Sequence, residues 1–250
     1  MKLIAIGDLH GRTDWMQIVR DNEFDKVVFI GDYFDTHEDI TPEQQKSNFE
    51  NIISYKKDNI NKAILLFGNH DYHYLKSVDE TYSGFQKMHR ADIAEMLHKA
   101  LDADLMQMCL IDNNFIFSHA GITKTWLNNV GYDWTKHLET FVNDLFKFKP
   151  LAFRFTSGVN RSPYGDDVCQ SPIWVRPKSL LTNCLDDYIQ VVGHTTKEQM
   201  EIIDDKIILI DTIRTSGEFL SINNKEISFL TLNKQSLWKK KTSNRNKLNK

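Results

Sequence analysis

Short apolar runs recur along the chain, and each one ends at a polar turn rich in Gly, Asp or His. The runs cover 3–6, 27–30, 64–67, 115–117, 188–192 and 207–210. A continuous apolar run with such a boundary is typical of a β-strand whose two faces are both buried. The pattern therefore predicts a sheet in which most strands lie inside the protein.

Segments with helical periodicity lie between these runs. The segment 41–44 places Thr at the N-cap, Pro at the first helical position and Gln where it closes a capping box. Phe49 and Ile52 then supply an apolar stripe. A second helix is predicted over 90–104, where apolar residues recur every four positions.

Strands dominate the pattern after Gly193, and the runs 218–222 and 226–232 predict a hairpin that turns at 223–225. Because strands and helices alternate before that point, the sequence predicts an α/β fold with some α+β character. We expect either a central mixed sheet or a two-sheet sandwich, flanked by helices. No linker or internal repeat divides residues 1–238, which we interpret as one domain.

The composition favours one globular domain and gives no electrostatic reason to expect nucleic acid or an anionic membrane as partner. The chain has 250 residues, of which 41% are hydrophobic and 26% charged, and its net charge is −3. The tail at 239–250 is rich in Lys and Arg. We interpret this tail as a solvated, disordered terminus; an arm that contacts nucleic acid is the less favoured alternative.

The three cysteines, Cys109, Cys169 and Cys184, are far apart and form no CxxC pair. This spacing argues against a disulfide framework and a thiolate zinc site, and it suits a reducing compartment. The first apolar run is too short for a signal peptide, and no apolar stretch is long enough for a membrane span. We expect a soluble, cytoplasmic protein.

Side chains that can bind metal follow the predicted strands, at the sheet edge where α/β proteins bind ligands. They are Asp8, His10, Asp32, Asp35, Asn69, His70, Asp71, His119 and His194. Carboxylate, imidazole and amide ligands without thiolate suit Mn²⁺, Fe or Zn²⁺. Two neighbouring cations need a shared anion to offset their repulsion, and Asp32 is the natural candidate.

Five ordered motifs resemble those of the calcineurin-like metallophosphoesterases. They are GDLHG (7–11), GDYFD (31–35), GNHD (68–71), SHAG (118–121) and VVGHT (191–195). IILIDT at 207–212 is similar to the strand that follows the last histidine in the phosphoprotein phosphatase branch, which includes bacterial and phage members and related diadenosine tetraphosphatases. Thr196 stands where many other metallophosphoesterases have a second histidine, and this favours that branch.

The resemblance implies a role for each matching residue. Asp8 and His10 would hold the first metal, Asp32 would bridge, and Asn69, His119 and His194 would hold the second metal. A water between the metals would attack phosphorus in line. His70 would protonate the leaving oxygen as general acid, and Asp35 would accept a hydrogen bond from His70 and keep it oriented.

Two positions depart from the branch. Thr36 and His37 stand where its second motif has Arg and Gly, and that Arg grips the phosphate oxygens. Another positively charged side chain is then needed. Arg176 and Arg161 are the substrate-binding candidates, and Arg12 is a further, less favoured one. Asp71 stands where phosphoprotein phosphatases mostly have Glu; Asp is usual in the wider superfamily, so this difference changes the expected chemistry little.

The predicted function is metal-dependent hydrolysis of phosphate monoesters on a phosphoprotein or a small phosphoester. Two divalent ions are expected, with Mn²⁺ favoured and Fe, Zn²⁺ or Mg²⁺ as alternatives. A nucleotide hydrolase of the diadenosine tetraphosphatase kind is the competing hypothesis. A non-catalytic metal-binding scaffold is less favoured, because His70 and Asp35 are both present and an idle site needs neither.

Aromatic residues leave two further questions open. Tyr33, Phe34 and Tyr72 flank metal motifs, and packing is favoured over stacking on a nucleobase. The segment 122–180 is rich in Trp and Phe, and it forms either a helical cap over the metals or ordinary core.

Overall fold

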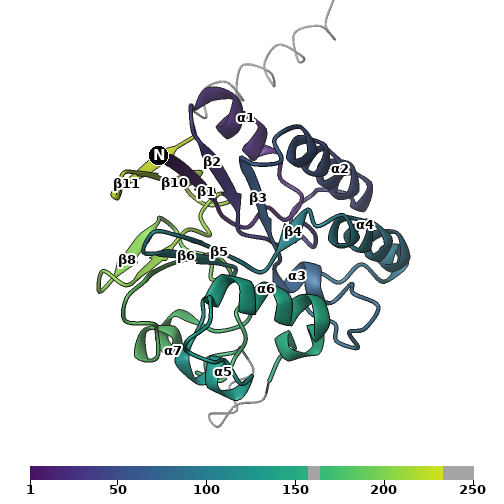
Figure 1. Ribbon diagram of the computed structural model, residues 1–250. Helices are drawn as coiled ribbons and strands as arrows, with labels where there is room; N and C mark the ends of the chain where they lie inside the picture. The colour runs from purple at the N-terminus through teal and green to yellow at the C-terminus, as the bar shows by residue number, and fades with distance from the viewer. Residues whose placement is uncertain (157–163, 233–250) are drawn as a thin grey trace, which may run out of the picture.

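The apolar runs form the strands of two mixed β-sheets that lie side by side in the molecule (Figure 1). The computed structural model describes residues 1–156 and 164–232, so that Arg161 and the basic tail at 239–250 lie outside the described residues. The six-stranded sheet has the order β11 (Glu226–Thr231), β10 (Glu218–Asn223), β1 (Lys2–Ile6), β2 (Lys26–Phe29), β3 (Ala63–Leu66) and β4 (Met106–Gln107). The five-stranded sheet has the order β5 (Cys109–Asp112), β6 (Phe115–Ser118), β7 (Ile189–Val192), β9 (Ile207–Leu209) and β8 (Glu201–Ile203).

Parallel strands form the centre of each sheet, and antiparallel strands lie at its edges. β1, β2, β3 and β4 run parallel, with β10 and β11 added antiparallel on one side. β6, β7 and β9 run parallel between antiparallel β5 and β8. The expected α/β class with flanking helices is therefore confirmed, and of the two predicted architectures the two-sheet one is present.

Helices cover the outer sides of both sheets. They are α1 (Asp14–Asp21), α2 (Pro42–Asp58), α3 (Asn69–Tyr72), α4 (Arg90–Asp102), α5 (Lys124–Asn129), α6 (Leu138–Phe148) and α7 (Pro177–Thr182), with 3₁₀ turns η1 (Lys87–His89) and η2 (Pro150–Phe153). In Figure 1, α1, α2 and α4 lie beside the six-stranded sheet, and α5, α6 and α7 lie toward the five-stranded one. The capping box predicted for α2 is present, because Thr41 Oγ1 accepts from Gln44 N–H and Gln44 Oε1 accepts from Thr41 N–H.

The predicted hairpin is also present, and it turns at two residues in the left-handed region, Asn224 (φ 47°) and Lys225 (φ 76°). Positive φ at both central residues gives a turn whose twist matches that of the flanking strands. The sequence analysis did not predict the short strands β4, β5 and β8, which are two to four residues long. Pairing with neighbouring strands, and not a pronounced apolar run, defines these elements.

The chain passes from one sheet to the other at Met108, the single residue between β4 and β5. Asn143 on α6 holds this corner, because its Oδ1 accepts from Met108 N–H at 2.9 Å and Cys109 N–H at 3.1 Å. A buried corner needs such a partner, because its N–H groups would otherwise be buried without a hydrogen-bond acceptor. Asn143 therefore links α6 to the junction between the sheets.

The three cysteines are free. In the described part of the chain, no helix has both the length and the apolar character that crossing a membrane requires.

The loops that follow β2 and β3 touch each other through two glycines. Gly31 has φ +109°, and a Cβ atom at this position would lie 2.6 Å from the amide nitrogen of Gly68. Real Cβ atoms do not approach backbone so closely, so any side chain at Gly31 would push the two loops apart. These loops carry Asp32 and Asn69, two of the candidate metal ligands.

We predict that Gly31→Ala lowers the free energy of unfolding by about 1–3 kcal/mol more than Gly131→Ala does, the usual cost of overpacking. Gly131 is the matched control, because it also has positive φ (+76°) but nothing lies within 4 Å of the point that a Cβ atom would occupy there. Chemical denaturation of both variants measures the difference. Equal destabilisation would show that the contact with Gly68 is unimportant and that only φ matters.

Candidate active site

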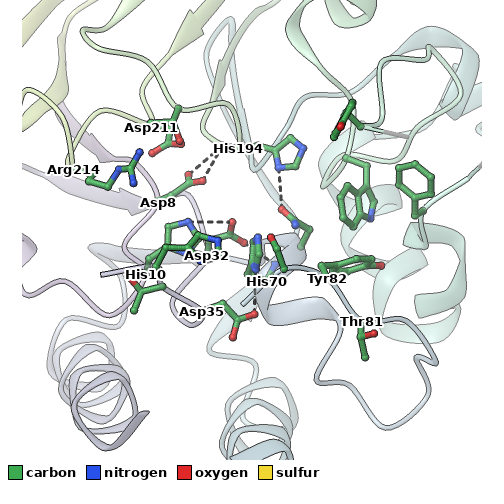
Figure 2. A pocket seen from close by; sticks show the side chains of 18 of the residues that line it. Asp8, His10, Asp32, Asp35, His70, Thr81, Tyr82, His194, Asp211 and Arg214 are labelled. Carbon is green, nitrogen blue, oxygen red and sulfur yellow. Dashed lines mark hydrogen bonds and ion pairs between the residues drawn. The ribbon is translucent and has the colours of Figure 1, made fainter. Parts of the chain in front are cut away.

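Five strands, drawn from both sheets, end at one pocket, and the loops that follow them bring the predicted metal-binding side chains together (Figure 2). The loop after β1 carries Asp8 and His10, and the loop after β2 carries Asp32. Asn69 begins α3 after β3, His119 follows β6, and His194 follows β7. The structure thus places all six candidate ligands in one cluster.

Asp32 lies between the two groups of ligands. Its Oδ2 is 3.8 Å from His10 Nε2 on one side and 3.4 Å from His119 Nε2 on the other. Asn69 Oδ1 is 2.9 Å from both His119 Nε2 and His194 Nδ1. Ligand atoms of Asp8, Asp32 and His119 all lie within 4.8 Å of one another. This is the position that a carboxylate shared by two cations requires.

Backbone carbonyl groups orient two of the imidazole rings. His10 Nδ1 lies 2.9 Å from Phe34 O, and His119 Nδ1 lies 3.1 Å from Ile30 O. A carbonyl accepts, so each Nδ1 carries the proton and each Nε2 presents a lone pair toward the cluster. An outer partner of this kind is typical of a metal-binding histidine, because it fixes both the tautomer and the ring orientation.

Four residues of the site have backbones in the left-handed region: His10 (φ 48°), Asp32 (φ 53°), Asp35 (φ 60°) and His194 (φ 62°). Such backbones are strained and persist only where surrounding contacts hold them. His194 N–H donates to both carboxylate oxygens of Asp8, and His10 N–H donates to Asp32 O at 2.7 Å. The motif loops therefore hold one another in place.

Asp71 also links the motif loops, a role that the sequence analysis did not assign to it. Its carboxylate is fully buried and accepts from the N–H groups of Asp32 (2.9 Å), Tyr33 (2.9 Å) and Gly68 (3.0 Å). Burial raises the pKa of Asp71 to about 7, although the three N–H groups act in the opposite direction. Asp71 thus connects the second and third motif loops.

The charges of the cluster suit a cation. Burial, followed by the repulsion of a neighbouring carboxylate, raises the pKa of both Asp8 and Asp32 well above the usual value. Burial also lowers the pKa of His10 and His119 to about 3, so that both imidazoles are neutral at physiological pH. Neutral imidazoles and crowded carboxylates are the donor set that a divalent cation would stabilise.

A second cluster surrounds Asp35. Its Oδ2 lies 3.1 Å from His70 Nδ1 and 2.6 Å from His73 Nε2. Its Oδ1 accepts from the hydroxyl of Tyr74 (2.5 Å) and from the side-chain Nε2–H of Gln86 (3.1 Å). Burial alone would raise the pKa of Asp35, but hydrogen bonds led by His70 and His73 lower it below the usual range. Asp35 is therefore an ionised and rigidly held carboxylate behind His70.

His73 also belongs to this cluster, although the sequence analysis did not single it out as a site residue. The residue is fully buried and contacts Asp35. Its Nδ1 accepts from Tyr82 N–H at 3.2 Å, so that Nε2 carries the proton that faces Asp35. The signal was present in the sequence, because residues three apart on a helical turn share one face.

The pocket has a volume of about 640 Å³, and positively charged side chains line it together with the candidate ligands. Arg176 donates from Nε to Tyr164 O (2.7 Å) and from Nη1 to His194 O (3.0 Å). Figure 2 shows Asp211 and Arg214 next to Asp8, on one side of the pocket. Of the two substrate-binding candidates, Arg176 lines the pocket, and Arg161 lies outside the described residues.

Aromatic side chains form the opposite wall, where Tyr82 is labelled in Figure 2. The ring of Trp174 lies 4.4 Å from that of Tyr82 and 5.1 Å from that of Phe155, and both contacts are edge-to-face. The three aromatic residues that flank the metal motifs, Tyr33, Phe34 and Tyr72, are fully buried instead. Packing, as favoured from the sequence, is their role.

The chain is similar in sequence and in fold to known proteins. The chain matches the model of the calcineurin-like phosphoesterase family over residues 1–197. A symmetrical bis(5'-nucleosyl)-tetraphosphatase of Nitrosospira multiformis is 25% identical over 138 residues, which are 50% of this chain and 46% of that protein. The match thus spans about half the length of this relative.

Two solved structures share the fold. A serine/threonine phosphatase of Saccharomyces cerevisiae superposes with a TM-score of 0.55 at 15% identity, over 93% of this chain and 80% of the other. A metallophosphoesterase of Sphaerobacter thermophilus superposes with a TM-score of 0.52 at 12% identity, over 93% of this chain and 88% of the other.

We predict that Asp32→Asn stabilises the chelator-treated protein by about 0.5–2 kcal/mol and reduces its stabilisation by Mn²⁺. Asn tolerates the left-handed backbone and still accepts from His70 N–H, while one of the repelling charges is removed. The parent should gain about 3 kcal/mol at a hundredfold excess of Mn²⁺ over Kd. Thermal unfolding with chelator and with Mn²⁺ measures both effects.

Asp186→Asn is the control, because Asp186 is an exposed carboxylate on the surface, paired with Lys124. It should leave the response to Mn²⁺ unchanged. A parent whose unfolding temperature is the same with chelator and with Mn²⁺ would contradict the prediction.

Proposed function

The chain belongs to the calcineurin-like phosphoesterase family, and from this premise we propose that it hydrolyses phosphate monoesters with two divalent cations. The observation that carries the proposal is the contact of His70 with Asp35 beside the ligand cluster. The imidazole of His70, fixed by Asp35, is a possible proton donor, and the neighbouring carboxylates and neutral histidines are a possible cation site. The pocket therefore brings the two together. Metal-dependent hydrolysis of a phosphate ester uses both.

Asp8 and His10 would hold the first cation, and Asp32 would be shared. Asn69, His119 and His194 would hold the second cation. When bound, the two cations would supply the positive charge that activates a water and stabilises the phosphate oxygens. Mn²⁺ fits the carboxylate, imidazole and amide ligands, and Fe, Zn²⁺ or Mg²⁺ are alternatives that the donor set admits.

His70 is the proposed general acid. Its Nδ1 faces Asp35, so its Nε2 is the atom left to give a proton to the leaving oxygen as the P–O bond breaks. The product alcohol and inorganic phosphate then leave, and solvent restores the proton to Nε2. The acid form of the ring carries a proton on both nitrogens; Asp35 accepts from Nδ1–H and holds the ring in the orientation that transfer from Nε2 requires.

Arg176 is the proposed substrate-binding cation of this pocket. Two backbone carbonyl groups hold its guanidinium, so little side-chain freedom is lost when it binds an anion. We propose a phosphorylated substrate, either a phosphoprotein or a small phosphoester. Arg161 remains a second candidate for the same role.

A nucleotide hydrolase is the second candidate function. The wall of Tyr82, Trp174 and Phe155 favours it, because aromatic side chains offer surfaces for a nucleobase. The pocket of about 640 Å³ also leaves space for more than a phosphate group. The relative from Nitrosospira multiformis carries the name of a dinucleotide tetraphosphatase, and this supports the same candidate.

The function is tested by restoring metal to chelator-treated protein. Mn²⁺, Zn²⁺ and Mg²⁺ are added one at a time, and phosphate release is measured from p-nitrophenyl phosphate and a phosphoserine peptide, with chromatography of diadenosine tetraphosphate digests. We expect metal-restored turnover of the monoesters that Asp32→Asn abolishes. Cleavage of the dinucleotide alone would favour the second candidate, and no turnover with any metal would contradict both.

We predict that His70→Asn lowers kcat by about 10²–10⁴-fold for phenyl phosphate but much less for p-nitrophenyl phosphate. A nitrophenolate leaves without a proton, whereas a phenolate needs one. Asn retains a side chain that can donate a hydrogen bond to Asp35. Equal losses on the two substrates would show that His70 acts in some other way than by protonating the leaving group.

A further inference from the structure

The loop after β2 lacks the cation that the phosphatase branch has there. Thr36 and His37 follow Asp35, and both line the pocket, but neither is a guanidinium. The pocket already contains the carboxylates of Asp8 and Asp211. An incoming phosphate dianion meets these negative charges, so it needs positive charge near this loop beyond that of the cations.

Arg12 lies against this same loop, although it comes from the loop after β1. Its Nε is 2.6 Å from Oε2 of Glu38, two residues after Thr36. Its Nη1 donates to Leu9 O at 3.0 Å, which folds the side chain back over its own turn. Only 10% of the side chain is exposed, and Arg12 lines the pocket together with Thr36 and His37.

The backbone of Arg12 is also held. Asn48 on α2 donates to Arg12 O at 2.9 Å, and Gly11 N–H donates to Tyr33 O at 2.9 Å. These contacts join the loop after β1 to α2 and to the second motif loop. An arginine fixed at both its backbone and its guanidinium loses little freedom on binding an anion.

The guanidinium keeps unused donors. Within the described part of the chain, Nη2 of Arg12 makes no hydrogen bond, and Nη1 makes one. The positive charge lies on the side of the candidate metal ligands, since Arg12 lines the pocket together with Asp8 and Asp211. Arg12 is thus anchored on one edge and has donors left for a further acceptor.

We propose that Arg12 binds the phosphate oxygens of the substrate in place of the arginine that the second motif lacks. The proposal rests on the function proposed above. Leu9 O and Glu38 hold the guanidinium, and its remaining N–H groups are the ones that contact the phosphate. A guanidinium is suited to this task because its N–H groups match two phosphate oxygens at once.

The test measures binding of inorganic phosphate to the Mn²⁺-loaded protein by calorimetry, independently of turnover. Arg12→Gln keeps a donor for Leu9 O but removes the charge, and we expect it to raise Kd for phosphate roughly 10- to 100-fold. The Kd of Arg12→Lys should lie between those of Arg12→Gln and the parent, because lysine keeps the positive charge but lacks the planar guanidinium with its several N–H donors. Arg20→Gln is the matched control; it removes a positive charge that is exposed on α1 and paired with Asp21, and Kd should not change.

Metal content and circular dichroism establish that each variant is folded and loaded before phosphate is added. An Arg12→Gln protein that holds its Mn²⁺ and binds phosphate with the parental Kd would overturn the inference and leave the proposed function intact. A loaded parent that neither binds phosphate nor hydrolyses any ester would overturn the inference together with the function. If Arg20→Gln weakens binding as much as Arg12→Gln, the effect is one of net charge, and the inference is wrong.

Discussion

The burial of Asp8 and Asp32 next to each other is the constraint on which the rest of the site depends. Burial raises the pKa of both carboxylates, and because isolated buried charge is costly, such a pair persists only with hydrogen bonds and a compensating cation. Backbone groups supply many of these bonds: Asp8 accepts from His194 N–H, and Asp32 accepts from His70 N–H. Because the ends of parallel strands meet at one edge, loops that are distant in sequence can support one another in this way.

The two walls of the pocket differ in chemistry, and this difference bears on the substrate. Arg214 lies beside Asp211 on one side, so this side of the pocket carries both a positive and a negative side chain. Tyr82 and Trp174 lie on the other side, where an apolar or aromatic group would be sheltered. The candidate metal ligands and His70 lie between them, so a substrate with a phosphate and a larger second part would span the pocket. Both candidate functions use the same centre and differ in what the aromatic wall contacts.

The sequence by itself predicted the central strands and the candidate ligands. Apolar runs that end in Gly and Asp identified the central strands, and the capping box located the start of α2. The six candidate ligands were found because each belongs to a short motif whose turn is set by nearby residues. The ends of the strands differ from the predicted ones by about a residue, because pairing partners and not composition decide where a ladder stops.

Only the tertiary structure decided which residues support those ligands. The contact of His73 with Asp35, the three hydrogen bonds to Asp71 and the position of Arg12 against Glu38 all depend on how the motif loops pack. The two-sheet arrangement likewise depends on the corner at Met108, which has no pronounced pattern in the sequence. A local motif fixes a turn through neighbours along the chain, whereas these contacts join segments that meet only after the sheets have formed.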